Sequence, residues 1–141
     1  MPELAGIETV LFLQSVDLFR FCTAEQILRL AAISRERRFA AGETIFEVDD
    51  PARDLFCVVQ GQVALAGDQG AVEEIGPLGT FGIEEILCGR LRVRSALARS
   101  DTLVLAMDAE DFFDLLANNI EIVKALFRRL LPQGARAAEK P

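Results

Sequence analysis

The sequence predicts a mainly β domain, a sandwich or a barrel, with helices at both ends. Short apolar or alternating runs fill residues 37–107, and turn signals separate them about every 8–12 residues, as in sandwiches and barrels. Segments of helical periodicity lie on both sides of this region. The chain has 141 residues, which suits one compact domain with its own core. We expect residues 1–131 to form this domain and residues 132–141 to be a disordered tail.

Composition and charge exclude several classes of function. Hydrophobic residues make up 51% and charged residues 26%, and the formal net charge of −7 disfavours direct binding to nucleic acid. The chain has no histidine, which excludes imidazole-based catalysis and removes the commonest transition-metal ligand. Cys22, Cys57 and Cys88 are far apart, which indicates reduced, mostly buried thiols. The sequence therefore predicts a protein that is not an enzyme and holds no metal or cofactor.

The sequence gives no sign of membrane insertion or export. No apolar run reaches the roughly 18 residues that a membrane helix needs. The first residues are acidic and lack the basic start of a signal peptide. These features predict a cytoplasmic protein.

The N-terminal region predicts helical structure that packs on the main body. Residues 10–21 are dense in apolar side chains. Thr23 is a predicted helix N-cap, and Gln26 three residues later completes a capping-box pattern. We interpret the basic run at residues 35–38 as the solvated end of this helix. The predicted packing stripe consists of Ile27, Leu28, Leu30, Ala31 and Ile33.

From residue 37 the periodicity changes to that of strands. Residues 43–48 alternate polar and apolar side chains, and residues 55–59 form an apolar run suited to a strand that is buried on both faces. Glycine-containing turns separate the strands. Further strands are predicted at residues 62–65, 72–75, 93–98 and 102–107.

Two helices are predicted after the last strand. Asp108 is a predicted N-cap, where its negative charge meets the positive end of the helix dipole. Asn118 and Asn119 break the helical pattern. The predicted packing residues are Phe112, Phe113, Leu115 and Leu116 in the first helix, and Ile120, Val123, Leu126, Phe127, Leu130 and Leu131 in the second.

One stretch, residues 79–98, combines a tight backbone turn with positive charge. Gly82 enters a helical turn, and Arg90, Arg92 and Arg94 follow at alternate positions in an otherwise acidic protein. Backbone N–H groups at the start of a helix and a nearby guanidinium both suit an anion. The sequence therefore predicts an anion site here, most simply for a phosphate.

The order of the predicted elements resembles the cyclic nucleotide-binding domain family. Residues 41–46, Ala-Gly-Glu-Thr-Ile-Phe, are similar to the family's Pro-Gly-Glu-x-Ile-Phe pair of strands. Residues 55–63 are similar to its apolar strand, glycine turn and second strand. The resemblance covers about residues 12–131. It implies a double-stranded β-helix of the jelly-roll type with N- and C-terminal helices, and cyclic AMP or cyclic GMP as a ligand.

The family's phosphate-binding cassette resembles residues 81–95 of this chain. Phe81 and Gly82 fall on its Phe-Gly pair, Arg92 on its phosphate-binding arginine, and Ser95 on the small or hydroxyl residues that follow. The resemblance implies that backbone N–H groups after the glycine and the arginine side chain hold the cyclic phosphate.

Three positions depart from the family pattern. Ile83 stands where the family has the glutamate that accepts hydrogen bonds from the ribose, and Glu84 lies next to it. Leu91 replaces the usual proline. Val93 and Arg94 replace two small residues. The predicted ligand-binding residues are Phe81, Gly82, Ile83, Glu84, Arg92, Val93, Arg94 and Ser95.

Two functions of different classes follow. In the first, the chain is a regulatory module that senses a cyclic nucleotide, or a related phosphorylated ligand, and signals through its C-terminal helices. In the second, the cassette binds no nucleotide, and the domain serves as a structural or protein-interaction module. In both, the terminal helices are the predicted contact to a second copy, a fused domain or a partner protein.

Overall fold

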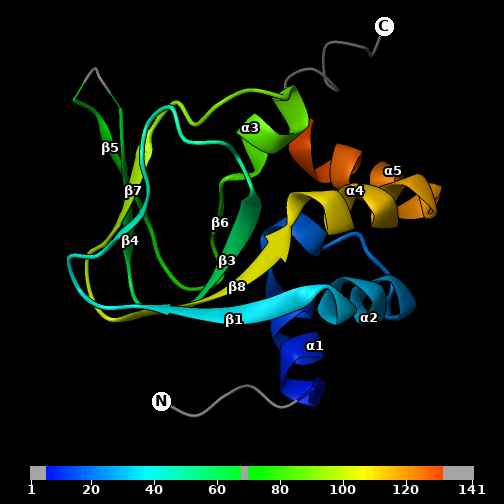
Figure 1. The fold of residues 1–141 in the computed structure, drawn as a ribbon. Helices are drawn as coiled ribbons and strands as arrows, with labels where there is room; N and C mark the ends of the chain where they lie inside the picture. Colours follow the sequence, from blue (N-terminus) through cyan, green and yellow to red (C-terminus); the bar gives the residue numbers. More distant parts are fainter. Residues whose placement is uncertain (1–5, 68–69, 132–141) are drawn as a thin grey trace, which may run out of the picture.

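The computed structural model describes residues 6–67 and 70–131 and contains two four-stranded antiparallel sheets with helices gathered at one end (Figure 1). One sheet has the strand order β1-β8-β3-β6 and the other β2-β7-β4-β5. The predicted class, mainly β with flanking helices, is confirmed. The strands are β1 (Ser34–Phe39), β2 (Thr44–Phe46), β3 (Asp54–Gln60), β4 (Val63–Ala66), β5 (Val72–Ile75), β6 (Thr80–Phe81), β7 (Ser95–Ala98) and β8 (Thr102–Asp108).

The second N-terminal helix begins at the residue that the capping pattern indicates. α1 (Gly6–Ser15) is followed by a short 3₁₀ turn and by α2 (Ala24–Ala32). The Gln26 N–H donates to Oγ1 of Thr23 at 3.2 Å, and the Thr23 N–H donates to Oε1 of Gln26 at 2.9 Å, so the predicted capping box is confirmed. The predicted stripe on α2 is too wide, because Ile27 and Leu30 are buried whereas Leu28 is 57% exposed.

The basic run at residues 35–38 lies in β1, so its interpretation as a helix end is wrong. β1 pairs with β8 in register over its whole length, from Ser34 opposite Met107 to Phe39 opposite Thr102. Arg35 and Arg37, which share one face of β1, form ion pairs with Asp54 on β3. The long-range ladder outweighs the local continuation of α2, since antiparallel pairing with β8 satisfies backbone N–H and C=O groups of β1 along one whole edge.

The hydrophobic core consists of two clusters. The first lies between the helices and the β1-β8-β3-β6 sheet and contains Phe19, Ile27 and Leu55. The second lies between the two sheets, where the rings of Phe56 and Phe81 stack at a centroid distance of 4.9 Å. The cassette stretch joins the two clusters, which makes its backbone part of the fold's framework.

The C-terminal helices follow directly from β8. Asp108 caps α4 (Ala109–Ala117) by accepting from the N–H groups of residues 110 and 111 at 2.9 and 3.1 Å, as predicted. α5 (Ile120–Leu130) begins after the predicted break at residues 118–119. The predicted packing face of α5 is wrong except for Leu126, which is buried, and Val123, which is half-buried. Its buried residues are Ile122, Ala125 and Leu126, whereas Ile120, Phe127, Leu130 and Leu131 are exposed; on α4, Phe113 is also exposed.

Candidate functional site

The cassette stretch forms a strand, a tight glycine turn and a short helix. β6 ends at Phe81, and α3 (Ile83–Cys88) begins two residues later. Gly82 between them has φ of 84°, in the left-handed region that glycine adopts without steric cost. A Cβ at this position would lie 3.0 Å from Nη1 of Arg92 and 3.3 Å from the carbonyl oxygen of Asp54. Glycine is therefore required here both by the backbone and by the close approach of Arg92.

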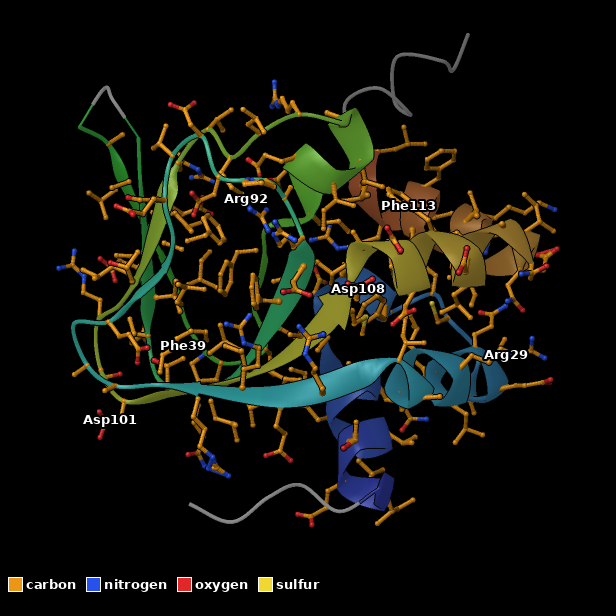
Figure 2. All side chains as sticks on the ribbon, in the orientation of Figure 1. Arg29, Phe39, Arg92, Asp101, Asp108 and Phe113 are labelled. Atoms are coloured by element: carbon orange, nitrogen blue, oxygen red, sulfur yellow. The ribbon has the colours of Figure 1, made fainter. Side chains whose placement is uncertain are left out.

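Arg92 is the centre of this site and is 2% exposed. Its Nη1 donates to the Gly82 carbonyl at 2.7 Å and to Oε1 of Glu85 at 2.9 Å, and its Nη2 donates to the Asp54 carbonyl. The guanidinium carbon lies 4.1 Å from the centroid of the Phe46 ring, within cation–π range. Figure 2 shows Arg92 between α3 and the β2-β7-β4-β5 sheet. The terminal nitrogens are thus held by groups of the protein itself, and Nε is a buried donor with no hydrogen-bond partner among the residues that the structure describes.

Glu85 supplies the anion that faces Arg92, and sequence reasoning did not select it. Glu85 is 5% exposed and forms a buried ion pair with Arg92, whereas the neighbouring Glu84 is exposed. Adjacent residues on a helix differ by about 100° in direction, so only one of the two glutamates can turn inward. The sequence feature that could have identified Glu85 is its position, one helical turn after Gly82 and seven residues before Arg92.

Ile83 points into the core on the helix side of the sheet. It is 3% exposed and packs in the cluster that contains Leu55 and Ile86. Phe81, two residues earlier, packs in the other cluster, between the sheets. Ile83 therefore fills core space among helices and lies in a different cluster from the Phe46 ring that covers Arg92.

The remaining predicted residues follow the loop into β7. Val93 is 44% exposed. Nη1 of Arg94 lies 2.8 Å from Oε1 of Glu73 on β5, and the Ser95 hydroxyl donates to the Ala66 carbonyl at 3.3 Å. Each of these side chains thus contacts the β4–β5 hairpin or solvent, and a role in ligand binding stays a prediction for them.

A chain of charged groups connects the cassette to β1. The Asp54 carboxylate is buried and pairs with Arg35 at 3.1 Å and with Arg37 at 3.4 Å, while its carbonyl accepts from Arg92. A cavity of about 370 Å³ lies against this chain and has aromatic walls from Phe46 and Phe56. Among the predicted ligand-binding residues, Arg92 alone lines this cavity; its other polar lining residues are Arg37, Asp50, Arg53 and Asp54.

The cysteines carry no sign of catalytic activation. All three are free thiols, and burial raises the pKa of Cys57 to about 12 and that of Cys22 to about 11, so both stay protonated at neutral pH. Cys88 is exposed at the end of α3. In residues 6–67 and 70–131, no group of three or more histidine, cysteine, aspartate or glutamate side chains is arranged to hold a metal ion.

Comparisons with known proteins agree with the fold. The family model described as the cyclic nucleotide-binding domain matches residues 36–119, which is more than half of the chain. The chain belongs to the cyclic nucleotide-binding domain family. The resemblance drawn from residues 41–46 and 55–63 is thereby confirmed.

Relatives of this family member occur inside larger proteins. An uncharacterized NTE family protein of Mycobacterium tuberculosis is 27% identical over 99% of this chain, and a cyclic nucleotide-gated potassium channel of Mesorhizobium japonicum is 26% identical over 88% of it. The chain spans only 25% and 34% of the lengths of these two relatives. No helix within the described part of the chain is long and apolar enough to cross a membrane.

Solved structures show the same fold. The sensor domain of the transcriptional regulator DNR from Pseudomonas aeruginosa superimposes with a TM-score of 0.77 at 20% identity, covering 96% of this chain and 95% of that domain. The catabolite activator protein of Thermus thermophilus superimposes with a TM-score of 0.70 at 29% identity, covering 87% of this chain and 60% of that protein. The two sheets therefore form the β-roll of this family, and the helices lie at its end.

Proposed function

We propose that this chain is a non-enzymatic regulatory module of the cyclic nucleotide-binding domain family that works without a bound nucleotide and acts through contacts with protein. The observation that carries this proposal is the burial of Arg92 in an ion pair with Glu85. In a nucleotide sensor the cassette arginine has to meet a phosphate. Here the Arg92 guanidinium is already paired with a carboxylate of the same chain.

The pairing of Arg92 makes phosphate binding costly. An incoming phosphate would have to displace Glu85, and a charge that loses its partner in a buried site costs about 3–5 kcal/mol. At about 1.4 kcal/mol per factor of ten, this lowers the affinity by roughly two to four powers of ten. The absence of a carboxylate at Ile83, which would accept from the ribose, lowers it further.

A nucleotide sensor is the second candidate, and one observation favours it. The backbone of the cassette is intact, with Gly82 in the left-handed conformation, α3 directly after it and the guanidinium of Arg92 bound to the Gly82 carbonyl. If the chain is a nucleotide sensor, a cyclic phosphate would replace Glu85 as the partner of Arg92, and the released carboxylate would move toward solvent. The ligand would then shift the equilibrium between two arrangements of α3.

The two candidates differ in the response of the melting temperature to ligand. A ligand at 100 times its dissociation constant stabilises a fold by about 2.7 kcal/mol, which raises the melting temperature of a domain of this size by several degrees. We expect no change with millimolar cyclic AMP or cyclic GMP. A saturable increase in the melting temperature of the unaltered chain would overturn the nucleotide-independent proposal and support the sensor.

The variant Glu85→Gln tests whether the negative charge of Glu85 prevents nucleotide binding. Glutamine keeps an acceptor for Arg92 but removes the competing negative charge, so phosphate would no longer have to displace a carboxylate. Glu84→Gln is the matched control, because Glu84 carries the same charge one residue away but is exposed. Binding of cyclic nucleotide that appears in Glu85→Gln and in neither the control nor the unaltered chain would identify the Arg92–Glu85 pair as the block.

A further inference from the structure

The cavity of about 370 Å³ is lined by residues of β1, β2, β3 and the loop between β2 and β3. Of the residues predicted to bind a nucleotide, only Arg92 lines it. Its volume lies at the lower end of the range of about 300–1,000 Å³ that ligand pockets span. The cavity therefore has room for a small molecule, and most of its lining lies outside the cassette.

Four of the residues that line the cavity are apolar. They are Ile45, Phe46, Pro51 and Phe56. The rings of Phe46 and Phe56 have their centroids 6.1 Å apart, and the half-buried Ile45 and Phe46 keep part of their surface accessible. An apolar or aromatic group in the cavity would remove this surface from water, which favours binding.

The other residues that line the cavity are charged, and two of them have no partner of opposite charge. Arg37 pairs with Asp54 at 3.4 Å, and Arg92 pairs with a glutamate of α3. Asp50 and Arg53 have no ion-pair partner among the residues that the structure describes, although they are only three positions apart. The cavity thus presents one free negative and one free positive charge beside apolar side chains.

Hydrogen bonds hold the backbone that carries these two charges. The Asp49 N–H donates to the Arg92 carbonyl at 2.8 Å, and the Arg92 N–H donates to the Asp50 carbonyl at 2.9 Å. The Asp50 carboxylate accepts from the Glu47 N–H at 2.9 Å, and Arg53 directly precedes β3. The loop is therefore ordered before a ligand arrives, which lowers the entropic cost of binding.

We propose that this cavity binds a free α-amino acid with an apolar or aromatic side chain. The carboxylate of the amino acid pairs with Arg53, its ammonium group pairs with Asp50, and its side chain lies against Phe46. A zwitterion meets both free charges at once, whereas a simple acid would place its charge near that of Asp50, and a simple amine would place its charge near that of Arg53. The Arg92–Glu85 pair stays in place, so this binding is independent of whether the cassette binds a nucleotide.

The test is isothermal titration calorimetry of the 141-residue chain with L-phenylalanine and L-leucine as probes. We expect saturable binding of at least one of them, with a dissociation constant between about 10 μM and 1 mM. The compounds 3-phenylpropionate, which lacks the ammonium group, and 2-phenylethylamine, which lacks the carboxylate, should each bind at least about fivefold more weakly than the amino acid. No binding of either amino acid at millimolar concentration, or equal binding of the two truncated compounds, would overturn the proposal.

Two variants that each remove one charge test the location of the site. Arg53→Gln and Asp50→Asn should each raise the dissociation constant for the amino acid at least about fivefold. Asparagine keeps an oxygen that can accept from the Glu47 N–H, and an unchanged melting temperature checks that the loop is retained. Arg90→Gln and Asp49→Asn are the matched controls, because both residues are exposed and lie outside the cavity lining. The controls should change the dissociation constant by no more than about twofold. Binding to Arg53→Gln that is as tight as to the unaltered chain would overturn the assignment.

Discussion

The sequence position of Arg92 and its contacts in the folded chain point to different roles for this residue. Its position in the sequence predicts an anion-binding guanidinium, and its three-dimensional neighbours are an anion, two carbonyl groups and an aromatic ring of the same chain. A buried guanidinium with these partners stabilises the fold by connecting β3, α3 and the loop before β7. The same side chain therefore has a structural role whether or not it ever meets a ligand.

Replacement of Arg92 should be strongly destabilising. Arg92→Ala leaves the Glu85 carboxylate buried without a partner, and we expect a loss of about 3–5 kcal/mol in the free energy of unfolding, measured by urea denaturation. Arg94→Ala is the control, because its pair with Glu73 is partly exposed and should contribute at most about 1 kcal/mol. Equal effects of the two replacements would show that Arg92 is not a structural residue.

The replacement Gly82→Ala measures how much the close approach of Arg92 to residue 82 contributes to stability. Alanine in the left-handed region costs about 1–2 kcal/mol wherever it occurs. At Gly42, which has φ of 88° and no neighbouring atom within 4 Å of an added Cβ, only this cost applies. At Gly82 the Cβ also displaces Arg92, so Gly82→Ala should reduce the free energy of unfolding clearly more than Gly42→Ala. Equal losses in thermal denaturation would contradict the contact.

At the level of elements, local signals compete with long-range pairing. The capping box of α2 and the cap of α4 are local, and both appear where the sequence indicates them. The run at residues 35–38 follows α2 without a glycine or proline to stop it, and pairing with β8 turns it into β1. In this chain, local sequence signals therefore predict the starts of helices more accurately than their ends.

The cap of α2 provides a test at this scale. Thr23→Ala removes the acceptor for the Gln26 N–H, and we expect a loss of about 1 kcal/mol in the free energy of unfolding, measured by urea denaturation. Gln26→Ala removes the reciprocal contact to the Thr23 N–H. The double variant should lose less than the sum of the two single losses, because the two contacts support each other. Strict additivity would argue against a cooperative box.

At the scale of the whole molecule, two core clusters share the β1-β8-β3-β6 sheet. Alternate residues of β3 face opposite sides, so Leu55 and Cys57 pack toward the helices while Phe56 and Val58 pack between the sheets. A strand that is buried on both faces couples the β-roll to its helices. We therefore expect the two parts to unfold together.

Thiol reactivity reports this coupling. At pH 8 a thiol reagent should modify the exposed Cys88 at least about a hundredfold faster than the fully buried Cys57, which reacts only when the core opens. Burial raises the pKa of Cys57 to about 12, so its contribution to stability is complete below the ordinary thiol pKa of about 8.5 and is lost as the pH rises toward 12. Equal labelling rates in the native protein would contradict a closed core.

The sequence by itself determined the features that depend on local chemistry and periodicity. These are the mainly β class, most of the strand positions, the caps at Thr23 and Asp108, and the place of the cassette between two strands. Each follows from side-chain period or from contacts within a few residues. The identity of the family follows from such short motifs as well.

Only the tertiary structure decided which side chains meet across the fold. Glu85 rather than Glu84 faces Arg92, and Ile83 turns into the helix-side core. Ile120 and Phe127 of α5 are exposed. These outcomes depend on how α3 and α5 are rotated about their axes when they dock, and that rotation is set by packing against distant residues. Arg92 can therefore be selected from the sequence as a candidate anion-binding residue, whereas its ion pair with Glu85 cannot be predicted from the sequence.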